Sequence, residues 1–345
     1  MNLVGKLIAG AGALGVLAAG CTAAAQMKAL QPDAAPSLAS SGGGMQRGID
    51  VDAYTYRGQD IPAAAKSVVQ YALRLHANAI SITFPFFMKG LDALGVTTRE
   101  STPTPHEMAV ITHTAEAYGL YVVFRPLLDE ASIGYQFRGN MRPQDPARWF
   151  ASYRRFLIPY ARAAQRAGAQ EFVVGTELSS LYKSRRWGPL DTAVRRVYRG
   201  TLAFDSNWYG VPSLGGAGGK GLAEGVDAYP GIPTHIAQGW KVYDHRLPAG
   251  TVEMEVGIAA VQGAFAAPYK HSWPGKLVDE SVQARWFTAA CDAAETAHLG
   301  GIYFWSINLS TKQSPPTPNA AGNWAHGAGA TAISRCFSSV QKDHK

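Results

Sequence analysis

The sequence predicts an α/β fold, a (β/α)8 TIM barrel, over residues 45–345. Apolar runs rich in Val, Ile and Phe alternate with amphipathic stretches, the pattern of strand–helix units. Eight such units fit into this length, since the barrel typically needs ~250 residues. A doubly wound sheet is the alternative, but no glycine-rich phosphate loop follows the first predicted strand.

The elements follow from the order of these runs. The predicted strands are 48–52, 79–84, 120–126, 171–177, 201–204, 225–229, 251–255 and 301–305. The predicted helices are 63–76, one that ends at 118, 146–167, 189–199, 234–243 and 280–298. Gly119 is expected to cap the helix before it, because glycine readily adopts the left-handed conformation of a helix C-terminus. The glycine-rich connection 209–224 is expected to lack a full helix.

The first 44 residues are expected to lie outside the barrel domain. An apolar run at residues 7–19 is too short to span a membrane comfortably, and Gly20-Cys21 follows it. This arrangement resembles a bacterial lipobox, so residues 1–21 are predicted to be a signal peptide with Cys21 as the lipidated residue. An ordinary secretory signal with an incidental cysteine is the alternative. Residues 22–44 are rich in Ala, Ser, Pro and Gly and predict a flexible tether. We therefore expect an exported protein of the bacterial cell envelope, held to a membrane by a lipid anchor.

Composition narrows the partners. The formal net charge is +7, but Lys and Arg are scattered without a long basic run, so nucleic acid is not expected as a partner. The chain has 8 Trp and 15 Tyr, and aromatic faces bind the apolar faces of sugar rings, so a carbohydrate ligand is favoured. The oligomeric state is left open.

The cysteine and histidine residues indicate whether a disulfide or a metal site is expected. Cys291 and Cys336 remain after Cys21, and in an exported protein they can form a disulfide or stay as separate buried thiols. The nine His are scattered, and no Cys/His cluster has metal-ligand spacing, so neither a metal nor a cofactor is expected.

Two glutamates carry the strongest indication of chemistry. Glu177 closes the fourth predicted strand and Glu255 closes the seventh. A carboxylate is costly to bury, and the C-terminal ends of barrel strands form the catalytic face. Two such carboxylates on different strands are what a glycosidase needs. Glu253, two residues before Glu255, is expected to point to the same side of its strand, with Arg125 as a candidate cation partner.

The sequence resembles glycoside hydrolase family 113 over about residues 47–308. The motifs that carry the resemblance are 148–156, 160–161, 174–178, 194–200, 227–230 and 255–257. The family belongs to the clan A barrel hydrolases, which are retaining β-glycosidases, and its characterised members are mainly β-1,4-mannanases. Met254 and Ile258 stand where the family pattern usually has Thr and Tyr, so the resemblance fixes the reaction class better than the sugar.

The resemblance implies roles for the two glutamates and for two aromatic residues. Glu177 would be the general acid/base, and Glu255 would be the nucleophile of a double displacement. Tyr229, at the end of the sixth strand, would donate a hydrogen bond to the nucleophile. Trp305, at the end of the eighth, would form the floor of the sugar subsite next to the scissile bond.

Further candidate substrate-binding residues end other strands. These are Arg125, Asn207, Trp208 and Asp52, each of which has a structural role as its alternative. Lower in rank stand four residues in the loops, Asp129, Arg138, Trp187 and Trp273.

The prediction is therefore a retaining β-glycosidase acting on a β-linked polysaccharide or oligosaccharide, with β-1,4-mannan as one candidate. Three alternatives remain at this point, of which a binder of anionic polymers, driven by the formal net charge of +7, ranks lowest. A transglycosylase would use the same two glutamates, and a non-catalytic glycan-binding envelope lipoprotein could use the same barrel. Endo or exo action is left open.

Overall fold

The computed structural model describes residues 44–209, 221–270 and 272–340. The expected signal peptide, Cys21 and all but the last residue of the tether lie outside the described residues, as does most of the connection 209–224. Among the helices of the described residues, none is both long enough and apolar enough to span a membrane.

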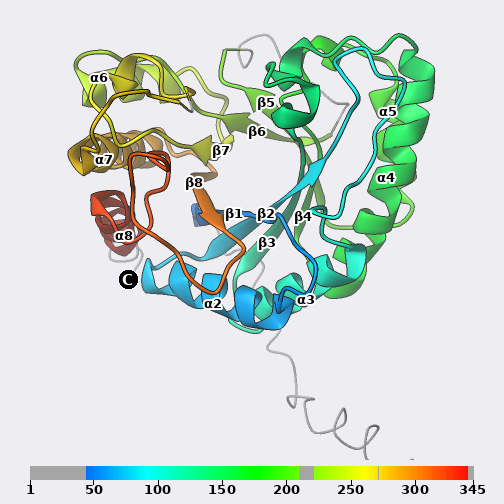
Figure 1. The fold of residues 1–345 in the computed structure, drawn as a ribbon, viewed down its shortest axis with the longest axis horizontal. Helices are drawn as coiled ribbons and strands as arrows, with labels where there is room; N and C mark the ends of the chain where they lie inside the picture. The colour runs from blue at the N-terminus through cyan, green and yellow to red at the C-terminus, as the bar shows by residue number, and fades with distance from the viewer. Residues whose placement is uncertain (1–43, 210–220, 271, 341–345) are drawn as a thin grey trace, which may run out of the picture. The chain divides into compact units, whose positions relative to one another are not determined.

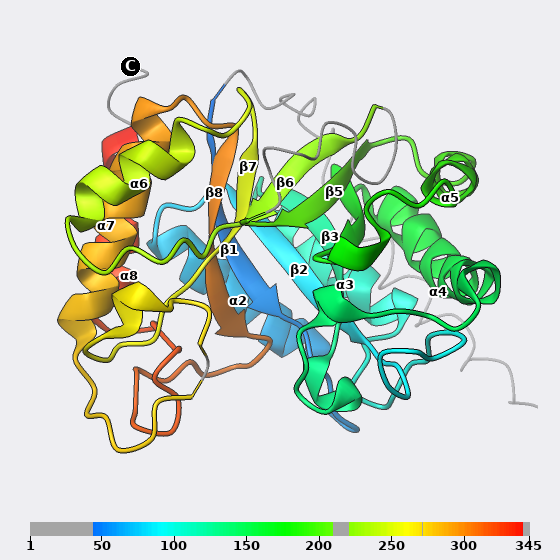
Figure 2. The same ribbon diagram turned by 90° about the horizontal axis from the view of Figure 1, so that it is seen from above.

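Eight parallel strands pair in chain order and close into a barrel, with helices around it (Figure 1), so the predicted fold class is confirmed. The strands are β1 (Gln46–Asp52), β2 (Ala79–Phe86), β3 (Tyr121–Leu128), β4 (Glu171–Thr176), β5 (Thr201–Asn207), β6 (Ala223–Asp227), β7 (Val252–Val256) and β8 (Gly301–Asn308). The helices are α2 (Ile61–Arg74), α3 (Pro105–Glu116), α4 (Pro146–Ala167), α5 (Trp187–Arg195), α6 (Ile236–Asp244), α7 (Glu280–Thr296) and α8 (Ala328–Val340). Figure 2 shows α4 and α5 on one side of the strands and α6, α7 and α8 on the other.

Side-chain caps fix where several helices begin. The Thr104 side chain accepts from the Glu107 backbone N–H, and the Glu107 carboxylate accepts from the Thr104 N–H, which is a capping box at the start of α3. At the start of α4, the Asp145 side chain accepts a hydrogen bond from the Arg148 backbone N–H. The predicted cap Gly119 has a left-handed φ of 76° but lies two residues beyond the C-cap Ala117.

The interior of the barrel is filled by small and medium side chains from most of the strands. They are Ala79, Val123, Val173, Ala203, Val252, Met254 and Tyr303. Gly48 leaves the space that the Tyr303 ring occupies, since a Cβ at Gly48 would lie 2.0 Å from Tyr303 Cδ1. The barrel is thus a packed core, and a ligand has to bind at its mouth.

The C-terminal helix α8 was not expected from the sequence. It packs on α7, and a disulfide joins Cys291 of α7 to Cys336 of α8 with a Cα–Cα distance of 6.0 Å. Within the described ranges, the one group of side chains close enough to share a metal is Cys291, Glu295 and Cys336. The disulfide removes both thiolates as ligands, so this group does not form a metal site.

Both strands that lead to the candidate glutamates carry one extra residue. Along β7 the pairing with β6 advances from Glu253 to Glu255 while β6 advances only from Val226 to Asp227. Along β4 the pairing advances from Val173 to Thr176 while β5 advances only from Ala203 to Asp205. Such a bulge reorients the side chains that follow it, and bulges are common beside active sites.

The bulge in β7 overturns one expectation. Val252 and Met254 both point into the barrel, so Glu253 points outward, where Asp244 of α6 is its ionisable neighbour. Glu255 instead contacts Arg125 inside the mouth. The prediction that Glu253 and Glu255 share a side, with Arg125 as the partner of Glu253, is therefore wrong, because the extra residue interrupts the two-residue period of the strand.

The buried pair of Glu253 and Asp244 predicts a pH-dependent stability. Burial raises the pKa of Asp244 to about 7 and that of Glu253 well above its usual value. Above pH ~4 the unfolded state has released these protons, while the folded state still binds them. The contribution of the protonated pair to the free energy of unfolding is therefore complete below pH ~4 and is lost as pH rises through 7. Removing both charges should make the protein more stable at pH 8 by a few kcal/mol, at roughly 1.4 kcal/mol per pKa unit.

Urea unfolding of the Asp244→Asn/Glu253→Gln variant at pH 5 and pH 8 measures this effect. We expect the advantage over the wild type to grow from pH 5 to pH 8. An equal difference at both pH values would show that the pair does not titrate in this range.

Candidate active site

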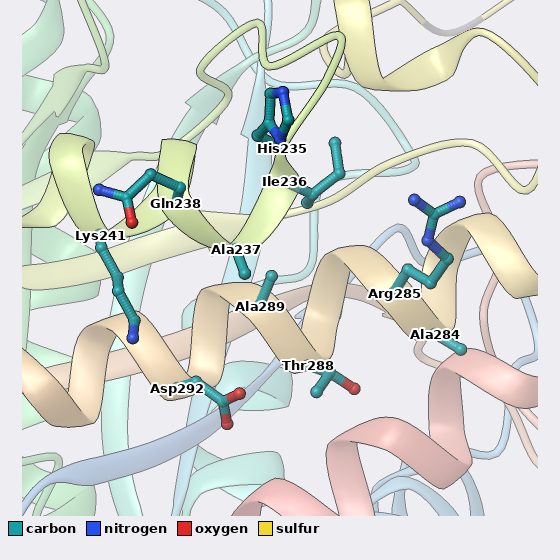
Figure 3. A pocket seen from close by; sticks show the side chains of 10 residues that line it. All are labelled: His235, Ile236, Ala237, Gln238, Lys241, Ala284, Arg285, Thr288, Ala289 and Asp292. Carbon is teal, nitrogen blue, oxygen red and sulfur yellow. The ribbon is translucent and has the colours of Figure 1, made fainter.

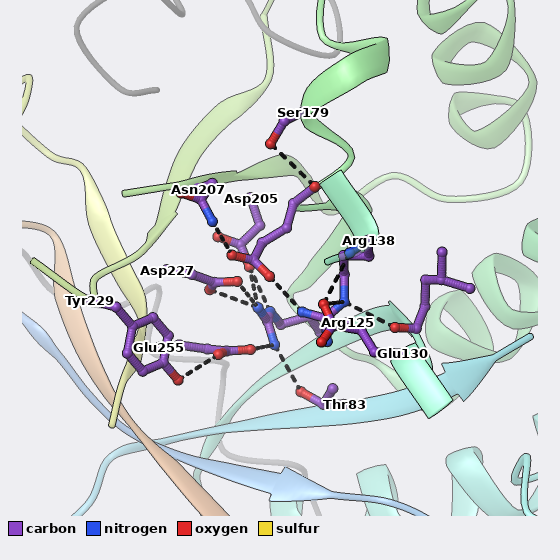
Figure 4. A network of polar contacts seen from close by, with 12 residues as sticks. Thr83, Arg125, Glu130, Arg138, Ser179, Asp205, Asn207, Asp227, Tyr229 and Glu255 are labelled. Carbon is purple, nitrogen blue, oxygen red and sulfur yellow. Dashed lines mark hydrogen bonds and ion pairs between the residues drawn. The ribbon is translucent and has the colours of Figure 1, made fainter. Parts of the chain in front are cut away.

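A buried arginine organises the barrel mouth. Arg125 of β3 is fully buried, and Figure 4 shows it at the centre of a polar network. Its Nε donates to Asp205 Oδ2 at 2.6 Å, and its Nη2 donates to both carboxylate oxygens of Asp227 at 2.7 Å. Its Nη1 lies 2.6 Å from Glu255 Oε1. Three carboxylates around one guanidinium carry excess negative charge, and burial raises the pKa of Asp205 and, to a greater extent, that of Asp227.

Glu255 is held from two sides. Arg125 contacts one carboxylate oxygen, and the Tyr229 hydroxyl donates to the other at 2.8 Å. A cation and a hydroxyl donor together suit an ionised carboxylate. The hydrogen bond expected for Tyr229 is thus present. The Glu255 side chain is 6% exposed, so it is not fully sealed from the mouth.

Glu177 has a different environment. Its carboxylate accepts from the Asn207 side chain on one oxygen, and Arg138 Nη1 lies 2.5 Å from the other. Burial, the largest cause, and the Glu255 carboxylate raise the pKa of Glu177 to about 7, although Arg138 lowers it. Glu177 can therefore give up and regain a proton near neutral pH, as a general acid/base requires.

The backbone of Glu177 is itself unusual. Its φ is 53°, in the left-handed region that non-glycine residues seldom adopt. Residues held there cost free energy, on the order of 1 kcal/mol or more, and they concentrate at functional sites. The Glu177 N–H donates to the Asp205 carbonyl at 2.9 Å, and the Glu177 carbonyl accepts from the Ser179 N–H at 2.8 Å. These contacts hold the side chain toward the mouth.

Arg138 lies in the 3-10 turn η3 (Arg138–Asn140), in the loop after β3. Its Nε donates to the Leu128 carbonyl at 2.9 Å, and its backbone N–H donates to Glu130 at 3.0 Å. The guanidinium is thus fixed against Glu177.

Replacing Arg138 by Met should raise the pKa of Glu177, because the cation that offsets its burial is lost. An opposite charge at this range shifts a pKa by about one unit or more. The basic limb of the pH–kcat/KM profile should therefore move to higher pH. An unmoved limb in a folded variant would show that Arg138 does not control this ionisation.

The other predicted site residues have mixed placements. Trp305 is half-buried, and Arg125 Cζ lies 5.8 Å from its ring centroid, so the ring borders the network. Asp52 ends β1 half-buried, and its pKa rises to about 7 because of desolvation and the nearby carboxylates of Glu255 and Asp129. Trp208 is half-buried in the loop after β5.

Of the four further candidates from the loops, some lie near the candidate site and one is a core residue. Arg138 contacts Glu177, and Asp129 accepts a 2.6 Å hydrogen bond from the Tyr54 hydroxyl. Trp187 is a buried core residue with its indole N–H on the Leu181 carbonyl. Trp273 lies in the loop between β7 and α7, beside Lys270.

Sequence reasoning did not find Asp205 and Asp227 as site residues. Asp227 ends β6 and stands in a motif that supports the family resemblance, and Asp205 lies two residues before the end of β5. A position near a strand end is a usable signal, but their pairing with Arg125 depends on closure of the barrel across 80 and 102 residues of sequence.

A hollow of about 680 Å³ lies on the outer surface between α6 and α7 (Figure 3). Lys241, Arg285 and Asp292 are among its lining residues. Asp292 is the one carboxylate among the described residues that line it, so this hollow does not offer the pair of acids found at the barrel mouth.

Comparison with known proteins supports a carbohydrate-active site. Residues 53–213 match the model of Glycoside Hydrolase Family 113, a range that contains Glu177 and ends before Glu255. No curated protein sequence gives a match.

The solved structures that resemble the chain include carbohydrate-active enzymes. A GH113 β-mannanase from Alicyclobacillus acidocaldarius, in complex with ManMIm, is 21% identical with a TM-score of 0.71, over 86% of this chain and 98% of that one. A complex of a GH113 β-1,4-mannanase is 15% identical with a TM-score of 0.74, over 86% and 99%. A family 5 mannosidase from Rhizomucor miehei is 12% identical with a TM-score of 0.51, over 89% and 98%. At these identities the structures support the fold alone. The family match over residues 53–213 confirms the predicted resemblance to glycoside hydrolase family 113 and indicates that the chain is a glycoside hydrolase.

Proposed function

We propose that the protein is a retaining β-glycosidase, with Glu177 as the acid/base and Glu255 as the nucleophile. One observation carries the proposal. The two strand-end glutamates lie in one connected network but in different environments, as an acid and a nucleophile require. The Glu255 carboxylate is also one of the groups that raise the pKa of Glu177, after burial.

The two steps follow from these environments. In the first, Glu255 attacks the anomeric carbon while Glu177 gives its proton to the leaving oxygen, which forms a glycosyl ester on Glu255. Glu177 is then ionised, the form that Arg138 and Asn207 stabilise by donating to its oxygens. In the second step Glu177 takes a proton from water, which attacks the anomeric carbon and releases Glu255.

The substrate that we propose is a β-1,4-linked mannan or its oligosaccharides. The names of the two family 113 structures above support this choice. The barrel mouth supports a sugar more generally, because Trp305 offers an aromatic surface beside a dense set of hydrogen-bonding groups.

Replacing Glu177 by Gln tests the acid role. We expect kcat/KM for β-1,4-mannohexaose to fall by about 10²–10⁴-fold, the usual contribution of a general acid. A substrate whose leaving group needs no proton, such as 2,4-dinitrophenyl β-mannobioside, should lose much less in its first step. Glu171→Gln is the matched control, since Glu171 is a buried glutamate at the opposite end of β4. Equal losses on both substrates would contradict an acid role for Glu177.

A further inference from the structure

Three aromatic side chains adjoin the groups that hold Glu177. Phe137 directly precedes Arg138, and Trp208 and Tyr209 directly follow Asn207. Arg138 and Asn207 are the two side chains that donate to the Glu177 carboxylate. The aromatic residues therefore belong to the acid/base side of the mouth.

The three rings form one cluster from two loops, which we call the aromatic wall. The Tyr209 ring lies 6.3 Å from that of Phe137 and 5.5 Å from that of Trp208, both in edge-to-face geometry. Tyr209 is 55% exposed, and the other two are half-buried. The wall thus keeps a cluster of aromatic surface open to solvent, and such a cluster, unlike a single exposed side chain, marks a candidate ligand site.

Contacts of neighbouring residues hold the two loops that carry the wall. The Asn207 N–H donates to the Tyr182 hydroxyl at 2.7 Å, and Ser179 donates to the same hydroxyl at 3.2 Å. Phe137 lies close over Gly139, where an added Cβ would be 2.2 Å from Phe137 Cε1. Rings that are fixed before binding lose little entropy when a ligand arrives.

We propose that Phe137, Trp208 and Tyr209 bind the leaving-group side of the glycan, the sugar units that depart after the first step. The inference rests on the proposed role of Glu177. A general acid must reach the glycosidic oxygen, so the departing sugar lies against the acid/base side of the mouth, where the wall stands. The apolar faces of pyranose rings pack on aromatic surfaces, so an uncharged sugar chain suits this wall. The wall then sets a preference for sugar leaving groups over small ones.

Two substrates that share the attacked sugar test the proposal. β-1,4-Mannohexaose places sugar units on both sides of the scissile bond, whereas β-mannobiosyl fluoride leaves only fluoride. In Tyr209→Ala we expect kcat/KM for the hexaose to fall about tenfold, the effect of one good aromatic contact. The value for the fluoride should stay within about twofold. Tyr209→Trp should restore cleavage of the hexaose, because it returns an aromatic face.

Tyr269→Ala provides the matched control. The exposed fraction of Tyr269, 54%, is similar to that of Tyr209. Tyr269 lies in the loop after β7 and does not belong to the wall. It should leave both substrates unchanged. Equal losses on both substrates in Tyr209→Ala, or no loss on either, would overturn the proposal.

A binding measurement separates this proposal from the proposed function. Calorimetry of mannohexaose binding to Glu177→Gln, with and without Tyr209→Ala, does not need turnover. If the wild type proves inactive but Tyr209→Ala still weakens binding about tenfold, the proposed function fails and the wall remains a glycan site. Unchanged affinity would overturn the wall, whatever the catalytic result.

Discussion

Replacing Glu255 by Gln is expected to lower kcat on β-1,4-mannohexaose by about 10⁴-fold or more, the scale seen when an enzyme loses its nucleophile. The amide keeps the size of the side chain and can still accept from the Tyr229 hydroxyl, but it cannot attack the anomeric carbon. It also removes the negative charge next to Arg125. Initial rates with reducing-end detection measure the effect.

The adjacent glutamate gives the matched control for this variant. Glu253 lies on the same strand, is fully buried and faces the outer side of the barrel. Glu253→Gln should keep kcat within about threefold of the wild type, because the side chain points away from the mouth, toward Asp244 of α6. If Glu253→Gln lost as much activity as Glu255→Gln, the loss would reflect damage to β7 and the nucleophile assignment would fail.

Replacing Arg125 by Met is expected to destabilise the fold by ~3–5 kcal/mol as well as to abolish activity. The substitution leaves the carboxylates of Asp205, Asp227 and Glu255 buried without their cation, and breaking a buried ion pair from one side carries this cost. The free energy of unfolding in urea at pH 7 measures it.

Two comparisons separate charge from packing in that experiment. Arg162→Met, at an exposed position on α4, should change the free energy of unfolding by less than about 0.5 kcal/mol. Adding Asp205→Asn and Asp227→Asn to Arg125→Met should recover part of the lost stability, since two of the unpaired charges are removed. No recovery would show that the arginine acts through its packing and not through its charge.

The sequence predicted the barrel because its signals are local. Alternation of apolar strands with amphipathic helices survives small errors in element bounds, and caps such as Asp145 mark helix starts directly. The C-terminal helix α8 was missed because it follows a long irregular segment, and its place depends on packing against α7 and on the Cys291–Cys336 disulfide.

The sequence predicts the parts of the candidate site in which a buried strand ends in a carboxylate. Glu177 and Glu255 stand out because a buried carboxylate is costly, whereas Arg138 lies in a loop whose path the sequence does not fix. Glu253 shows the limit of periodicity. A single extra residue in β7 places Glu253 and Glu255 on opposite sides of the strand, and the pattern of residue types alone does not locate such a bulge.

Trapping the covalent intermediate tests the central claim most directly. The protein would be incubated with 2-deoxy-2-fluoro-β-mannosyl fluoride, which slows release of the glycosyl ester, and digested for peptide mass spectrometry. We expect a 2-fluoromannosyl adduct on Glu255 that accumulates in the wild type and is absent from Glu255→Gln. An adduct on another residue, or turnover of mannohexaose with inverted product stereochemistry, would show that Glu255 is not the nucleophile of a retaining mechanism.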